Sequence, residues 1–168
     1  MKTEMQLSGF GEMLNLLHDL PPEVVSSKGG PVKAALKKGA QVILKQEKIN
    51  LQAVTSNATS TGKRESTGLL LKSLIASRGK APSGGKGERY LVRVKKRIYA
   101  DANGKTVTTL QTAQLLEYGS SHQPMEPFIR PAFETKAKEA ILTVEKEFIS
   151  QMVKIVKALA KQRSAPKP

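Results

Sequence analysis

The longest regular pattern in the chain is a stripe of apolar residues in its last third. Apolar positions recur there at steps of four and three residues, at Phe133, Ala137, Ile141, Val144, Phe148, Met152, Ile155 and Leu159. Because an α-helix has 3.6 residues per turn, this spacing places all of them on one face. The pattern predicts one continuous helix over residues 131–163. Pro131 stands in its first turn, where the N–H that proline lacks has no helical partner to lose.

Two more helical patterns lie in the N-terminal third. Residues 10–20 (FGEMLNLLHDL) have one apolar face, with Ser8 as a candidate N-cap and two prolines, residues 21–22, after them. His18 falls on the polar side, so we expect a solvated helix residue there. A second helical stretch runs from Pro22 to about Leu51, and KGGP at 28–31 predicts either a kink or a fresh start at Pro31.

The middle of the chain has the spacing of β-structure. Over residues 89–111, Tyr90, Val92 and Val94 alternate with their neighbours, and the pair Asn103–Gly104 suits a tight hairpin turn. Residues 68–77 (GLLLKSLIAS) fit a short helix or a first strand equally well. Polar, Gly- and Ser-rich stretches at 55–68 and 79–88 predict loops, the second a hairpin-like connector.

These elements predict one α+β domain over residues 1–163. A small antiparallel or mixed β-sheet packs against two long helices, one N-terminal and one C-terminal, with a short N-terminal helix in addition. Mobile loops are expected near 55–67 and 79–88, and a disordered tail at 164–168. A chain of 168 residues is long enough to bury a core of this kind as one domain.

Composition excludes several classes of site. The chain has no cysteine and two histidines, so neither a disulfide nor a zinc site is expected, and we predict no metal and no cofactor. Apolar runs end after three or four residues and the first ten lack the core of a signal peptide, which predicts a soluble protein without a membrane contact. The segment GKAPSGGKGE is not a phosphate loop, because Gly87 stands where Ser or Thr is required.

The net charge of +14 is concentrated in the middle of the chain. Residues 61–110 hold 12 Lys and Arg against 3 acidic residues. Such an excess attracts polyanions, so a basic nucleic-acid-binding module is one candidate function, and an acidic protein partner is another. The candidate contact residues are Lys80, Lys86, Arg89, Lys95, Lys96 and Arg97. The last three instead protect a sheet edge if they lie on an outer strand.

A proline-rich segment precedes the C-terminal helix, and we call residues 117–133 the strap. It gathers three prolines (Pro124, Pro127, Pro131) and three aromatics (Tyr118, Phe128, Phe133) in a chain that is 4% aromatic. Proline restricts the residue before it to extended conformations, so residues 123–130 are expected to run extended. The strap is then either a rigid cap for the following helix or a contact surface for another chain.

No catalytic constellation is apparent. His122 lies among serines with no triad partner at a recognisable spacing, and the glutamates of the C-terminal helix alternate with lysines as surface ion pairs do. We therefore predict no catalytic residues.

Two sequence elements of the strap carry a family resemblance. Glu117–Tyr118–Gly119–Ser120 resembles an E-[FY]-G-[TS] element, and residues 124–133 (PMEPFIRPAF) resemble P-x-x-P-[FY]-[LI]-R-P-A-[FL]. In this order they are similar to the signature of the tail-completion or head–tail joining proteins of long-tailed bacteriophages. The segment STGLLLKSL and the two N-terminal helical patterns also resemble that family, so the resemblance spans nearly the whole chain, although the basic stretch at 79–105 is not diagnostic.

The resemblance implies a structural, non-enzymatic virion protein at the neck, where the tail meets the head. It implies a homo-oligomeric ring, six-fold to match a phage tail, that contacts head-completion (stopper), tail-terminator and tail-tube proteins, with DNA in the channel as a further candidate contact. The protein is then expected in the host cytoplasm during assembly and in the virion afterwards. Within the strap, we expect Phe128 and Phe133 to be buried anchors and Arg130 to pair with Glu117 as a bidentate ion pair.

Overall fold

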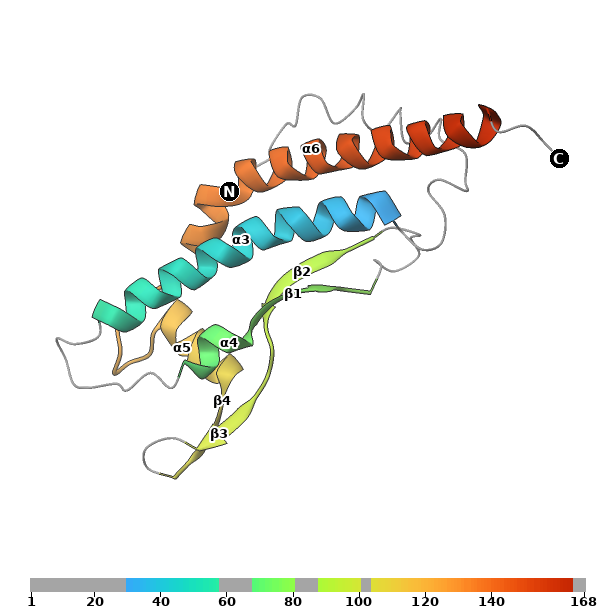
Figure 1. The fold of residues 1–168 in the computed structure, drawn as a ribbon. Helices are drawn as coiled ribbons and strands as arrows, with labels where there is room; N and C mark the ends of the chain where they lie inside the picture. The colour runs from blue at the N-terminus through green and yellow to red at the C-terminus, as the bar shows by residue number, and fades with distance from the viewer. Residues whose placement is uncertain (1–29, 58–67, 81–87, 101–103, 165–168) are drawn as a thin grey trace.

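The computed structural model describes residues 30–57, 68–80, 88–100 and 104–164. The predicted helix at 10–20, most of both predicted loops, Asn103 of the hairpin turn and the C-terminal tail lie outside the described residues. In the described part the chain is α+β, as the sequence predicts, with long helices packed against small antiparallel strand pairs (Figure 1).

Two long helices lie antiparallel along one side of the molecule (Figure 1). They are α3 (Gly30–Asn57) and α6 (Ile129–Ser164). Asn50 of α3 meets the start of α6, where its Nδ2 donates to the Phe128 carbonyl at 3.1 Å, and Lys38 pairs with Glu147 further along. At Gly39 the helices come so close that a Cβ would overlap the Val144 side chain. The long C-terminal helix is therefore confirmed, beginning two residues earlier than its stripe predicted.

The ends of α3 differ from the pattern-based prediction. The helix begins at Gly30, so Pro31 stands in its first turn, which confirms the alternative of a fresh start there. It ends at Asn57, and the prediction of a loop from residue 55 is therefore wrong. Thr55 Oγ1 donates to the Leu51 carbonyl and Ser56 Oγ to the Ala53 carbonyl, so both side chains bond back to the helix in an end that has little apolar patterning.

Residues 68–77 form both structures that the sequence left open. A single helical turn, α4 (Leu69–Ser73), runs directly into β1 (Leu74–Arg78). Strand β1 pairs antiparallel with β2 (Tyr90–Val94), with Leu74 opposite Val94 and Arg78 opposite Tyr90. Residues 79–88 therefore connect the two strands of a hairpin, as predicted.

A second strand pair follows. Strand β3 (Ile98–Ala100) pairs antiparallel with β4 (Thr106–Thr108), and Gly104 between them has the positive φ of 73° that a tight turn needs. The described strands thus form two separate two-stranded sheets, and the prediction of one sheet is too simple. Lys95, Lys96 and Arg97 occupy the connection between the two pairs.

One helix was not predicted from the sequence. Helix α5 (Thr109–Tyr118) begins directly after β4, so the prediction of β-structure up to residue 111 is wrong. Thr108 and Gln111 form a capping box: the Thr108 side chain accepts from the Gln111 N–H, and the Gln111 side chain accepts from the Thr108 N–H. This reciprocal cap ends the strand and starts the helix.

The buried core lies where α3, β1, α5 and the start of α6 meet. Its centre is the cluster of Leu51, Leu74, Ala113 and Phe128, surrounded by half-buried Leu44, Leu70, Leu71, Val94, Leu116 and Ile129. Phe128 is fully buried, so the residue before α6 anchors that helix to the rest of the domain.

Candidate functional site

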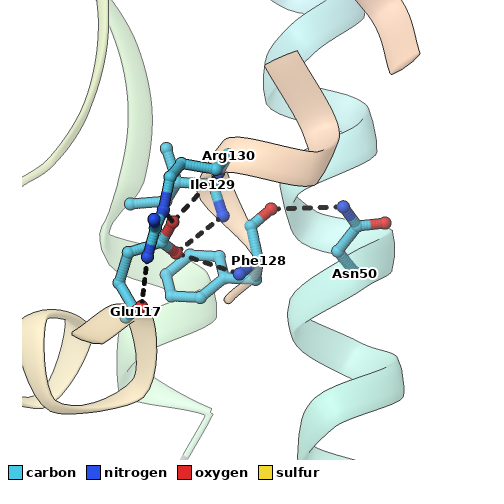
Figure 2. Close-up of polar contacts among 5 residues, drawn as sticks. All are labelled: Asn50, Glu117, Phe128, Ile129 and Arg130. Carbon is cyan, nitrogen blue, oxygen red and sulfur yellow. Dashed lines mark hydrogen bonds and ion pairs between the residues drawn. The ribbon is translucent and has the colours of Figure 1, made fainter. Parts of the chain in front are cut away.

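The strap is built around one buried carboxylate. Glu117, on the last turn of α5, is 4% exposed and accepts from the first three backbone N–H groups at the start of α6 (Figure 2). The distances are 2.9 Å from Phe128 N, 2.9 Å from Ile129 N and 3.1 Å from Arg130 N. A helix N-terminus leaves such N–H groups without partners and carries a partial positive charge. Glu117 therefore caps α6 from a different helix.

The cap keeps Glu117 ionised. Burial raises the pKa of this carboxyl, but the three backbone N–H groups and the Arg130 guanidinium together outweigh burial and hold its pKa below the usual range. The negative charge is thus a permanent part of the folded chain at neutral pH.

Arg130 reaches back from α6 over the end of α5. Its Nε donates to Glu117 Oε1 at 3.1 Å and its Nη2 to the Glu117 backbone carbonyl at 2.9 Å. The guanidinium carbon lies 5.2 Å from the centre of the Tyr118 ring, within range of a cation–π contact. The predicted Arg130–Glu117 pair is confirmed within one chain, although one arm of the guanidinium goes to the backbone and the pair is not bidentate on the carboxylate.

The strap between α5 and α6 is held by its backbone. Gly119 ends α5 with φ 72° and lies so close to the strap that a Cβ would come 2.9 Å from Gln123 O and from Met125 N. Ser120 and Gln123 bridge one another, and Glu126 N donates to the Leu116 carbonyl at 2.8 Å. From Pro124 to Pro127 the strap runs without regular structure, exposed at Pro124 and half-buried at Pro127.

Two expectations for the strap are wrong. Ile129 and Arg130 are helical, not extended, because the Glu117 cap starts α6 before Pro131, which itself lies half-buried in the first turn. Phe133 is 53% exposed and is not a buried anchor. Ala132 continues the buried face that Phe128 begins, and successive helical residues differ by about 100° in direction, so Phe133 turns toward solvent.

The predicted basic residues do not form one patch. Lys80 and Arg89 lie at the loop end of the β1–β2 hairpin, whereas Lys95, Lys96 and Arg97 follow the other end of β2, about 20 Å away at 3.3 Å per residue. All five are exposed, and Lys86 lies outside the described residues.

Residues 95–97 are held rigidly by their backbone. Thr109 Oγ1 donates to the Lys95 carbonyl at 2.7 Å and accepts from Arg97 N at 2.9 Å, and Thr109 N donates to the Arg97 carbonyl at 3.0 Å. Lys95 N donates to the Ser73 carbonyl at 2.7 Å. The three cationic side chains therefore project from a fixed backbone into solvent.

An apolar groove of about 580 Å³ runs between α3, β2 and α6. Ile43, Leu91, Ala137 and Ile141 line it, and we call it the α3–α6 groove. Glu47 also lines this groove and is 3% exposed, although no donor to its carboxylate is found among the described residues. Burial, and then the charge of Glu117, raise the pKa of Glu47 to about 7.

Glu47, Asn50 and Thr109 were not predicted from the sequence as residues of the site. A signal existed for Glu47, because it occupies a position of the helical stripe that Ala40, Leu44 and Leu51 otherwise fill with apolar side chains. The start of α5 was also visible as Thr108 followed by Gln111. Asn50 had no signal, since its partner is a backbone carbonyl 78 residues away.

In the described part of the chain no three acidic or histidine side chains gather as metal ligands would. Within the same residues no helix has the length and apolarity to cross a bilayer. Comparisons of the chain with protein-family models, with curated proteins and with solved structures found no match.

Proposed function

We propose that this chain is a structural protein of the head–tail junction of a long-tailed phage, where copies of it assemble into a ring that completes the tail. The observation that carries the proposal is the strap. The two sequence elements that resemble the tail-completion family, EYGS and PMEPFIRPAF, meet in one capped joint through Glu117 and Arg130. Members of one family are expected to share the residues on which their fold depends.

The strap also supports a role in contact with other chains. Tyr118 is 70% exposed and Met125 and Phe133 are also exposed, so apolar side chains face solvent on a backbone that is already fixed. A rigid segment loses little conformational entropy when it docks, and aromatic side chains dominate interface energetics. Neither feature is needed by a helix cap alone.

The test is the mass of the protein in solution over a range of concentrations, followed by negative-stain imaging. The proposal expects ring-shaped particles of about six copies at high concentration or after addition of phage tails that lack this component. It is contradicted if the protein stays monomeric under both conditions. A monomer that binds duplex DNA, with an affinity falling steeply with salt, indicates the nucleic-acid-binding alternative instead.

The matched variants are Arg130→Ala and Lys138→Ala. Arg130→Ala removes the guanidinium from both the Glu117 cap and the Tyr118 ring, so we expect a lower melting temperature or weaker assembly. Lys138 is an exposed cation on the same helix, and its removal is expected to change neither. An unchanged melting temperature and an unchanged mass for Arg130→Ala contradict the role given to the strap.

A further inference from the structure

The α3–α6 groove contains an unusual carboxylate. Glu47 is buried in an apolar setting without a donor among the described residues, and a buried polar group of this kind costs free energy until a partner reaches it. Glu134 on α6 also lines the groove and is exposed. Arg130 lines the groove too, but its guanidinium is paired with Glu117. The groove therefore offers apolar surface, two carboxylates and one paired guanidinium, in a chain that carries twice as many cations as acidic residues.

The same chain presents the complementary surface elsewhere. We call Lys95–Ile98 the basic segment: three exposed cations followed by Ile98, whose side chain is 69% exposed. Its backbone is clamped by Thr109 and Ser73, so the segment is already in one conformation before it meets a partner. An apolar side chain flanked by cations matches an apolar groove that contains carboxylates.

The basic segment cannot reach the groove of its own chain. Tyr90, Leu91 and Val92 of β2 line the groove, and the basic segment begins directly after Val94 at the other end of that strand. The strand is held by its pairing with β1, so the chain cannot turn back on itself there. In Figure 1 the β3–β4 pair projects away from α3 and α6. A second copy of the chain is the occupant with matching chemistry.

We propose that the basic segment of one copy docks in the α3–α6 groove of the next, with Ile98 on the apolar wall and Lys96 and Arg97 beside Glu134 and Glu47. The two surfaces lie on different parts of the subunit, so the contact is head-to-tail and can repeat around a ring. The inference rests on the proposed ring assembly and names the contact that forms it.

The expected strength of this contact decides how it must be tested. Four residues in a groove bury far less than the roughly 1,200 Å² of a standard stable interface, so a single contact is weak and transient. In a closed ring the contacts act together and strengthen one another. Disulfide cross-linking captures brief encounters of this kind. The chain has no cysteine, so introduced cysteines react without a background from native thiols.

The experiment mixes two single-cysteine variants, Ile98→Cys and Ala137→Cys, under mild oxidation with copper phenanthroline. We expect the disulfide between the two variants to form several-fold faster than in a control that pairs Ile98→Cys with Ser150→Cys, an exposed position of α6. Adding Arg97→Glu to the first variant is expected to slow the reaction. Adding Glu134→Arg to the second is expected to restore it, because the charges then complement each other again.

Equal rates with the control, or a rate that Arg97→Glu leaves unchanged, overturn the proposal. A disulfide formed instead within one chain that carries Met13→Cys and Ala137→Cys assigns the groove to residues 10–20 and also overturns it. The oligomer is measured separately by mass and imaging. Rings without the 98–137 cross-link refute only this contact, whereas the cross-link without rings supports the contact and counts against the ring.

Discussion

Glu117 combines two tasks that are normally divided between residues. It replaces an N-cap residue for α6, and it holds Arg130 over Tyr118. Capping by a side chain of the same segment contributes about 1 kcal/mol. A buried carboxylate that accepts from three N–H groups and a guanidinium is worth more, because hydrogen bonds to charged groups are stronger.

Replacing this carboxylate by an amide tests the cap. Glu117→Gln keeps the size of the side chain but turns an N–H group toward donors, so we expect the free energy of unfolding to fall by about 3 kcal/mol. Denaturant unfolding at neutral pH measures it. Glu139→Gln is the control, because Glu139 is an exposed partner of Lys136 and such pairs contribute less than about 1 kcal/mol. Equal losses in the two variants contradict the capping role.

Glu47 makes the stability of the fold depend on pH. Its pKa is about 7 in the folded chain and about 4.5 in the unfolded chain, so the folded state holds an extra proton between these values. The free energy of unfolding therefore falls as pH rises from 4.5 to 7, by at most ~3 kcal/mol and by less once solvent screening is included. Above pH 7 the full cost of the ionised carboxylate remains.

The variant Glu47→Gln removes this titration. It is expected to match the unchanged chain at pH 5 and to be more stable at pH 8, as measured by denaturant unfolding at both values. Glu117, whose lowered pKa stabilises the fold at neutral pH and loses that effect on acidification, is present in both proteins and largely cancels in the difference. A difference that does not change with pH contradicts the assignment.

At the scale of elements, the sequence predicted what depends on local pattern. The apolar stripe determined α6, the alternation at Tyr90–Val94 determined β2, and Pro31 marked the start of α3. Helix α5 was missed because TVTTL alternates like a strand, while the switch to helix depends on a side-chain cap at Thr108. One sheet was predicted where the structure has two separate strand pairs. The hydrogen bonds that hold the connection between the pairs do not affect the periodicity of the sequence.

Within the candidate site, local chemistry predicted the Arg130–Glu117 pair but not the direction of Phe133. The pair follows from two opposite charges in a short rigid segment. The exposure of Phe133 depends on which face of α6 meets α3, and that face is chosen by contacts such as Gly39 against Val144, which only the folded chain brings together. Glu47 could be found in the sequence as a charged residue in an apolar helical stripe. The groove around it could not be predicted, because three elements far apart in the sequence form it.

Thr109 holds the connection between the strand pairs, and its removal has a local effect. Thr109→Val keeps the shape of this buried side chain but leaves Arg97 N and the Lys95 carbonyl without their partner. We expect amide hydrogen exchange at Arg97 to become at least tenfold faster, because one hydrogen bond contributes about 1 kcal/mol or more. Exchange within α6 should stay unchanged. Uniform acceleration of both regions indicates global destabilisation instead.

At the scale of the whole molecule, the proposed docking and the titration of Glu47 are linked. A cation beside Glu47 favours its ionised form, so association releases a proton and tightens as pH rises through 7. The other ionisable groups along this part of the molecule are Tyr90 on β2, Arg130 and Glu134 on α6, and Glu117 on α5. Sedimentation of the unchanged chain at pH 6 and pH 8 measures the effect.

The control for this measurement is Glu47→Gln, which cannot ionise. Its association should be weaker at pH 8 and should lose the difference between the two pH values. If Glu47→Gln keeps the whole difference in association between pH 6 and pH 8, another group titrates on association and Glu47 is not part of the contact.

The cap described at Glu117 also has a mechanical consequence. Helix α6 has 36 residues and is about 54 Å long at 1.5 Å per residue, and its first turn is fastened to α5 through one carboxylate. A tilt of about 5° at that joint would displace the far end by roughly 5 Å over such a length. The stiffness of this joint, together with the packing of α6 against α3 at Gly39 and Val144, therefore determines how accurately the far end of the helix is positioned.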